Sequence, residues 1–160
     1  MATRPQHRRF EIVPMKPGDL DEIMEIEKVS FRAPWSRQVF VEELEREWAH
    51  VDVLRPRAAP SKVIAFVNYW LVRDEVHVLN VATHPEARRQ GHAARLIEHV
   101  IAFAHRQKCR YLTLEVRRSN QPAIRLYRKY GFRPVGIRPN YYVEDNEDAI
   151  VMLLELEAES

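Results

Sequence analysis

The segment 88–93, with the sequence Arg-Arg-Gln-Gly-His-Ala, joins a predicted strand to a predicted helix. Such a turn directs backbone N–H groups and the positive end of a helix dipole at one spot, which suits a phosphate. Gly91 and Ala93 are small enough for a ligand to approach the backbone closely. The segment lacks the Gly-Lys-Ser/Thr ending of a P-loop, and its single glycine does not make a dinucleotide fingerprint. These residues predict an anion site, with an ordinary turn carrying solvated arginines as the alternative.

Three other side chains are candidates for acid–base or nucleophilic catalysis. Glu115 lies on a predicted strand, and without further information a solvent-facing glutamate paired with an arginine is the simpler interpretation. Tyr127 falls on the apolar face of a predicted helix. Its position is also that of an ordinary core tyrosine with no part in catalysis. Cys109 has no evident base beside it, which favours a buried structural thiol over a covalent nucleophile.

Composition sets limits on the class of protein. The chain has 160 residues, 46% hydrophobic and 30% charged, with a formal net charge of +2. This favours one soluble domain and gives no argument for direct nucleic-acid binding or a membrane surface. A single cysteine excludes an internal disulfide, and no histidine pair has metal-ligand spacing, so we expect no metal. We expect a cytoplasmic protein because no apolar run approaches the ~18 residues of a membrane span.

Hydrophobic periodicity predicts an α/β chain of α+β type. Helices are expected at 19–29, where Asp19 and Glu22 have capping-box spacing, after Ser36, after Gly91, and from 119–122 to Gly131. The second helix should carry an apolar stripe of Phe40, Leu44 and Trp48. Strands are expected at 10–15, 50–54, 62–72, 75–83, 111–116, 132–137 and 149–156, with a polar loop at 138–148. The order predicts a single mixed sheet with helices on both faces, in one domain spanning 1–160 with a flexible tail at 1–8.

The pattern Arg88-x-x-Gly91-x-Ala93 resembles the (Gln/Arg)-x-x-Gly-x-(Gly/Ala) acetyl-CoA motif of the GNAT N-acetyltransferases. Further segments resemble the RimI-like branch of that family, which acetylates protein N-termini: Ala33-Pro34-Trp35-Ser36, Leu114-Glu115-Val116-Arg117, Ser119-Asn120, Leu126-Tyr127, Gly131-Phe132, Asn140-Tyr141-Tyr142 and Glu147-Asp148-Ala149. The matches cover roughly residues 10 to 155. The sequence departs from the family pattern at His92, at Ala93 and in the proline-containing loop 55–61. The first two leave the backbone donors in place, and the loop would alter one wall of the substrate entrance.

The resemblance implies a GNAT fold and acetyl-CoA as co-substrate. Its pyrophosphate would lie on the loop before the central helix, and its pantetheine arm would pair with a strand. The cofactor-binding residues implied in this way are Val81, Ala82, Thr83, Arg89, Gln90, Gly91, His92, Ala93, Ala94 and Asn120. A backbone N–H of Val81 or Ala82 would stabilise the oxyanion.

The resemblance also assigns the proton transfers. Glu115 would be the general base that takes a proton from the attacking amine, directly or through water. Tyr127 would be the general acid for the departing thiolate, since a phenol near ~10 and a thiol near ~8.5 differ little in pKa. The implied mechanism is direct attack in a ternary complex.

The acceptor implied by the resemblance is a protein N-terminus, most specifically the N-terminal alanine of ribosomal protein bS18. Tyr141 and Tyr142 would order the peptide, and carboxylates of loop 138–148 would attract basic residues. At pH 7 an α-amine of pKa ~7.8 starts about 3.5 kcal/mol better off than a lysine of pKa ~10.4. The alternatives are a lysine or small-amine acetyltransferase and a non-catalytic CoA-binding or ribosome-associated module. We expect a monomer or weak dimer.

Overall fold

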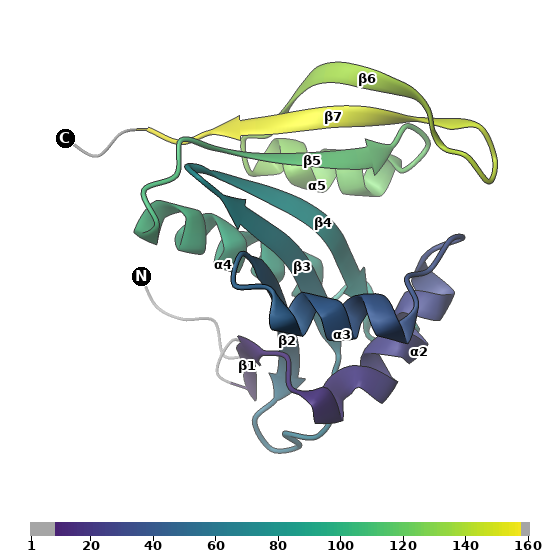
Figure 1. Cartoon of the computed structure of the whole chain (residues 1–160), viewed down its shortest axis with the longest axis vertical. Helices are drawn as coiled ribbons and strands as arrows, with labels where there is room; N and C mark the ends of the chain where they lie inside the picture. Colours follow the sequence, from purple (N-terminus) through teal and green to yellow (C-terminus); the bar gives the residue numbers. More distant parts are fainter. Residues whose placement is uncertain (1–8, 158–160) are drawn as a thin grey trace. The chain divides into compact units, whose positions relative to one another are not determined.

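The computed structural model describes residues 9–157, so the expected tail at 1–8 lies outside the described residues. The elements follow the predicted order (Figure 1): β1 (Phe10–Pro14), η1 (Pro17–Asp19), α2 (Leu20–Ser30), α3 (Arg37–Glu45), β2 (Ala49–Pro56), β3 (Ala65–Val72), β4 (Glu75–Thr83), η2 (Pro85–Ala87), α4 (His92–Arg106), β5 (Tyr111–Arg117), α5 (Gln121–Lys129), β6 (Arg133–Tyr142) and β7 (Glu147–Glu155). The strands form a mixed sheet in the order β1-β2-β3-β4-β5-β7-β6. The predicted fold class is therefore confirmed.

The described residues cluster in two compact units. The first contains residues 9–69 and 80–99, and the second contains residues 70–79 and 100–157. The strands β3 and β4 and the helix α4 each contribute residues to both units. No helix among residues 9–157 is long and apolar enough to cross a membrane.

The first unit begins with an antiparallel pair, β1 and β2, with Phe10 opposite Pro56 and Pro14 opposite Asp52. Its core gathers apolar side chains from α2, α3, β2, β3 and β4, from the residue after β1 and from the segment before β3: Met15, Leu20, Ile23, Ile26, Phe40, Val51, Val53, Val63, Phe66 and Ala82. The apolar stripe predicted for α3 is confirmed at Phe40, which is buried, and is wrong at Leu44 and Trp48. The helix ends at Glu45, so Trp48 lies beyond it, and Leu44 and Trp48 are both exposed.

Helix starts in the first unit depend on short polar contacts. Ser36 caps α3 as predicted, because its hydroxyl accepts a hydrogen bond from the Val39 N–H. The predicted capping box of Asp19 and Glu22 does not form. Asp19 instead accepts from the Lys16 N–H at 2.8 Å, and Glu22 accepts from the Val63 N–H. The Glu22 carboxylate thus accepts a hydrogen bond from the backbone before β3 and does not cap the start of its own helix.

The second unit is built on β5, whose burial alternates as predicted. Leu112, Leu114 and Val116 are buried, and the residues between them are half-buried. One side of β5 pairs antiparallel with β7, from Tyr111 opposite Glu155 to Arg117 opposite Ala149.

On its other side, β5 pairs in parallel with β4. This pairing runs from Glu75 opposite Tyr111 to Val78 opposite Leu114. Glu115 is therefore the first β5 residue after the last of these pairs.

The strand β6 is the last strand of the sheet order and pairs with β7 alone. Its residues are almost all exposed, and its register shifts between Pro134 and Gly136 and between Arg138 and Tyr142. The predicted loop at 138–148 is too long, because β6 continues to Tyr142 and β7 begins at Glu147. The connecting loop is 143–146.

Candidate active site

The loop from β4 to α4 lies in the first unit and has the backbone of an anion site. After the short helix η2, Arg89 has φ +64° and Gly91 has φ +82°, and α4 begins at His92. Alternating left-handed residues turn successive N–H groups toward one side, and the first N–H groups of a helix have no partner within it. A Cβ built on Gly91 meets no atom within 4 Å. The N–H groups of the loop therefore border open space, and Gly91 is required by its backbone conformation.

His92 contributes its backbone to this loop while its ring lies in the core. The ring packs edge-on against Phe10, with 4.8 Å between centroids, and the residue is 6% exposed. Burial, aided by the nearby charge of Arg95, lowers the pKa of His92. The neutral ring thus fills the place of an apolar side chain, and only the backbone of His92 is left for a ligand.

A buried carboxyl group, Glu27 on α2, also lies in the first unit. It is 1% exposed, and its Oε2 accepts from the Trp35 N–H at 2.8 Å. Asn80 on β4 approaches Oε1 at 3.5 Å. Burial raises the pKa of Glu27 to about 7, even though the hydrogen bond from Trp35 acts in the opposite direction. Glu27 is not among the site residues predicted from the sequence, although a glutamate beside Ile26 on the apolar side of α2 is a signal for it.

Glu115 lies in the second unit and is not solvent-facing. Its side chain is 10% exposed and both of its oxygens have cationic or polar neighbours. His77 Nε2 lies 2.6 Å from Oε2, and Arg138 lies 3.5 Å from Oε1. The hydrogen bond with His77 lowers the pKa of Glu115, and the Arg138 charge adds to this against the opposing effect of burial. Glu115 is therefore held as a carboxylate at neutral pH.

The predicted acceptor-side tyrosines gather near Glu115. Tyr142 and Tyr141 are in edge contact at 5.1 Å, and Arg138 lies 5.6 Å from the Tyr141 ring. Burial raises the pKa of Tyr142 to about 12, and its tyrosine neighbours and the Glu115 charge add to the increase. Burial also raises the pKa of Tyr127 to about 12, and the Tyr127 ring packs on Phe132 at 5.8 Å. Within this unit, Glu115, Tyr127, Tyr141 and Tyr142 thus form one neighbourhood.

Arg117 binds three carboxylates of the acidic hairpin. It hydrogen-bonds to Glu144, to Asp145 at 2.8 Å and to Glu147 at 3.0 Å, and its guanidinium lies 4.1 Å from the Tyr142 ring. Burial works against its charge, but these bonds raise the pKa of Arg117 overall. These three carboxylates fix the hairpin around Arg117, which also contacts the Tyr142 ring. One guanidinium offsets only one of their three negative charges, so the expectation that carboxylates of this loop attract a basic peptide stays a prediction.

Asn120 stands at the N-cap of α5. Its Oδ1 accepts from the Ala123 N–H at 3.3 Å, so the side-chain oxygen is engaged in the helix start and the amide donors remain for another partner.

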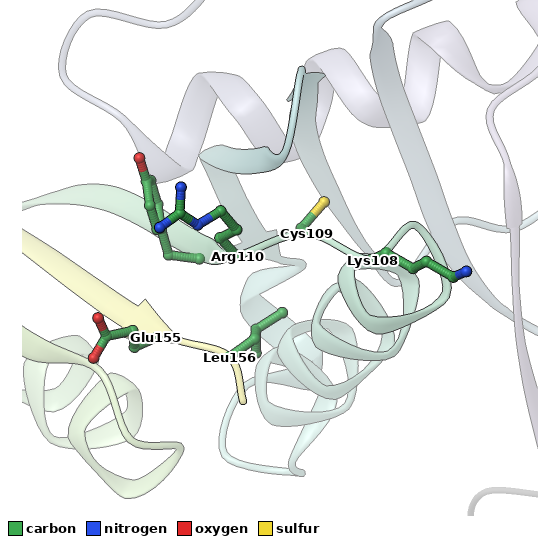
Figure 2. A pocket seen from close by; sticks show the side chains of 6 residues that line it. Lys108, Cys109, Arg110, Glu155 and Leu156 are labelled. Carbon is green, nitrogen blue, oxygen red and sulfur yellow. The ribbon is translucent and has the colours of Figure 1, made fainter. Parts of the chain in front are cut away.

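Cys109 lines a small surface pocket at the start of β5, together with Lys108, Arg110, Tyr111, Glu155 and Leu156 (Figure 2). The cysteine is 7% exposed. Burial, with the negative charge of Asp74, raises the pKa of the Cys109 thiol. A thiol in this state is a poor nucleophile, which agrees with the structural role predicted for it.

His77 is the principal residue that the sequence analysis missed. It stands on β4 opposite Thr113 in the parallel pairing, and Thr113 shares a face of β5 with Glu115. Reading both strands with a two-residue period would have placed His77 on the same face as Glu115. No group of three or more histidine, cysteine or acidic side chains in residues 9–157 has the arrangement of a metal site.

Comparison with known proteins gives consistent matches. Residues 20–132 match the model of the Acetyltransferase (GNAT) family. The [ribosomal protein bS18]-alanine N-acetyltransferase of Escherichia coli (strain K12) is 34% identical over 88% of this chain and 93% of that protein. A candidate enzyme of the same description from Bacillus subtilis (strain 168) is 37% identical over 86% of this chain and 90% of its own length.

A solved structure agrees with the sequence matches. The crystal structure of the ribosomal-protein-S18-alanine N-acetyltransferase from Escherichia coli aligns with a TM-score of 0.84 and 33% identity. The alignment covers 94% of this chain and 96% of the crystallised one.

Proposed function

The chain belongs to the acetyltransferase (GNAT) family, and we propose that it transfers an acetyl group from acetyl-CoA to the N-terminal alanine of ribosomal protein bS18. The E. coli relative carries that substrate in its name, and its match extends over nearly the whole of both chains. The reaction is a direct attack of the amine on the thioester.

The loop before α4 supports acetyl-CoA as the donor. Two left-handed residues, Arg89 and Gly91, open the N–H groups of the loop toward space that a side chain does not fill. These donors and the start of α4 suit the pyrophosphate of CoA. In this proposal the backbone from Arg89 to Ala94, the strand end Val81–Thr83 and the amide of Asn120 bind the donor, which supplies an activated acetyl group.

The main support for a peptide amine as acceptor is the ionised Glu115, which lies near Tyr127, Tyr141 and Tyr142. A carboxylate attracts a protonated amine, and aromatic rings beside it suit the first residues of an extended peptide. In this proposal Glu115 promotes loss of the amine proton, and Tyr141 and Tyr142 contact the peptide. An α-amine suits such a site better than a lysine because far more of it is neutral at pH 7.

Tyr127 is proposed to assist the departing thiolate as a hydrogen-bond donor. With a pKa of about 12, Tyr127 keeps its proton throughout the neutral range. Complete transfer of the Tyr127 proton to a thiolate of pKa ~8.5 would be unfavourable by about 3.5 pKa units. The short-lived negative charge on sulfur is stabilised without that transfer, and the thiolate takes its proton elsewhere.

An acetylation assay with three peptides tests the proposal. The first begins with the alanine of bS18, the second is the same peptide with its N-terminus blocked, and the third carries a lysine behind a blocked N-terminus. Mass spectrometry should find one acetyl group on the first peptide alone. Equal acetylation of the blocked peptide would reject the N-terminal assignment. Binding of acetyl-CoA without CoA release for any amine would favour the non-catalytic alternative.

A further inference from the structure

The hydrogen bond between His77 and Glu115 determines which imidazole nitrogen carries a proton. His77 Nε2 lies 2.6 Å from Glu115 Oε2. The lowered pKa of Glu115 keeps it ionised at neutral pH, and an ionised carboxylate only accepts hydrogen bonds. Nε2 is therefore the donor in this contact. In the neutral ring the basic lone pair is then on Nδ1.

Glu115 by itself is poorly suited to take a proton from an amine. Oε2 is engaged by His77 and Oε1 faces Arg138 at 3.5 Å. Even a carboxyl of ordinary pKa ~4.3 is disfavoured about 3,000-fold as acceptor from an α-ammonium of pKa ~7.8. The contacts of Glu115 increase that disadvantage because they stabilise the carboxylate. An imidazole, with an ordinary pKa of ~6.5, is disfavoured only about 20-fold.

The arrangement of the two side chains also places the imidazole nearer to solvent. The His77 side chain is 29% exposed, whereas that of Glu115 is 10% exposed. The His77 ring is in edge contact with Trp70 at 6.1 Å, so its orientation is supported from β3 as well as from β5. Among the described residues, the charged groups beside this pair are Glu115 itself and, on β6, Arg138. The titratable rings of Tyr141 and Tyr142 also interact with Glu115.

We propose that His77 is the group that accepts the proton of the attacking amine, at Nδ1, and that Glu115 is its positioning residue. This rests on the proposed function of the chain as an acetyltransferase. Glu115 holds the ring in one tautomer and stabilises the imidazolium that forms, as a carboxylate does behind a histidine base.

The acceptor amine enters the reaction as an ammonium group. The ammonium gives one proton to Nδ1, and the freed nitrogen lone pair forms the C–N bond at the thioester carbonyl carbon. The C–S bond breaks, and its electron pair leaves on the sulfur of CoA. The thiolate takes the second proton of the amine and becomes the free thiol. The imidazolium returns its proton to solvent, so each turnover releases one proton.

His77→Gln is the decisive variant. The glutamine amide can still donate to Glu115 in place of Nε2, but it has no basic nitrogen. We expect kcat/KM for the Ala-starting peptide to fall about 100-fold or more, with little change in the KM for acetyl-CoA. The pH profile should lose the acidic limb that protonation of a histidine base produces. His105→Gln, at an exposed histidine on α4, is the matched control and should behave as the wild type.

Four further results decide the proposal. A His77→Gln enzyme within a few-fold of the wild type, with the same pH profile, would overturn it, because a merely structural partner of Glu115 is preserved by glutamine. Should this variant fail to fold, His77→Ala is assayed with added imidazole, where restored turnover supports the proposal and no restoration overturns it. If the wild type acetylates an amine other than the peptide, the substrate assignment fails and His77 is tested with that amine. A wild type that acetylates no amine overturns both.

Discussion

Replacing Glu27 by glutamine should change how the stability of the protein depends on pH. Glu27 is almost fully buried, and its pKa in the folded chain is about 7, against an ordinary value of 4.5. The folded state therefore binds this proton more tightly than the unfolded state does. The contribution of Glu27 to stability is complete below about pH 4.5 and is lost as the pH rises through about 7. Glutamine keeps an oxygen for the Trp35 N–H and has no proton to lose.

The size of the effect follows from the two pKa values. Their difference, 7 − 4.5, is about 2.5, and at about 1.36 kcal/mol per pH unit it corresponds to about 3 kcal/mol. Relative to the wild type, Glu27→Gln should therefore gain up to about 3 kcal/mol in free energy of unfolding between about pH 5 and pH 8.5. Urea unfolding at a series of pH values measures this difference directly.

Glu25→Gln is the matched control for this experiment, because Glu25 is exposed on the same helix and the substitution removes the same charge. Its stability difference from the wild type should change little with pH. A raised pKa of Glu27 is contradicted if the Glu27→Gln difference is constant from pH 5 to 8.5, or if the variant loses stability relative to the wild type as the pH rises.

Four other substitutions test separate parts of the structure. Tyr127→Phe removes one hydrogen-bond donor to the departing sulfur, so it should lower kcat about 100-fold in steady-state assays and leave the acetyl-CoA KM unchanged. Unchanged turnover would remove Tyr127 from the mechanism. Gly91→Ala forces a side chain into φ +82°, at a strain of about 1–2 kcal/mol, and calorimetry should show roughly tenfold weaker acetyl-CoA binding. Wild-type affinity would contradict this. Arg117→Ala leaves like charges together in loop 143–146, so proteolysis there should be faster at low than at high salt. A rate equal to that of the wild type would contradict it. Cys109→Ala should keep full turnover, and the wild-type thiol should react slowly with a disulfide reagent. Loss of turnover would indicate that Cys109 acts as a nucleophile.

The order and type of the elements could be predicted because local patterns agree with the fold. The apolar period of α4 and the two-residue alternation of β5 are strong signals, and both elements lie where the periodicity predicts them. The errors fall where a local pattern competes with a distant partner. Asp19 and Glu22 have the spacing of a capping box, yet the Glu22 carboxylate binds the backbone of Val63. That contact depends on how α2 lies beside the chain before β3, which no local window contains.

The candidate site could be predicted only where the residue type limits the possibilities. Gly91 has a positive φ, which its type allows at little steric cost. Glu115 and Tyr127 could be named by resemblance, but their neighbours could not. The pairing of Glu115 with His77 comes from the β4–β5 register. The contacts of Arg117 with the β6–β7 hairpin come from the antiparallel pairing of β5 with β7. Both need three-dimensional pairing rather than composition.

The outer edge of β6 has a consequence for solubility. An edge strand with exposed Val135 and Ile137 would ordinarily be a template for strand addition by a second molecule. Pro134 and Pro139 have no N–H to offer, and the register shifts beside them, with Asn140 at φ +51°, break the regular spacing of the remaining donors. Growth of a shared sheet from this edge is thus discouraged, and the apolar strand can stay uncovered without promoting aggregation.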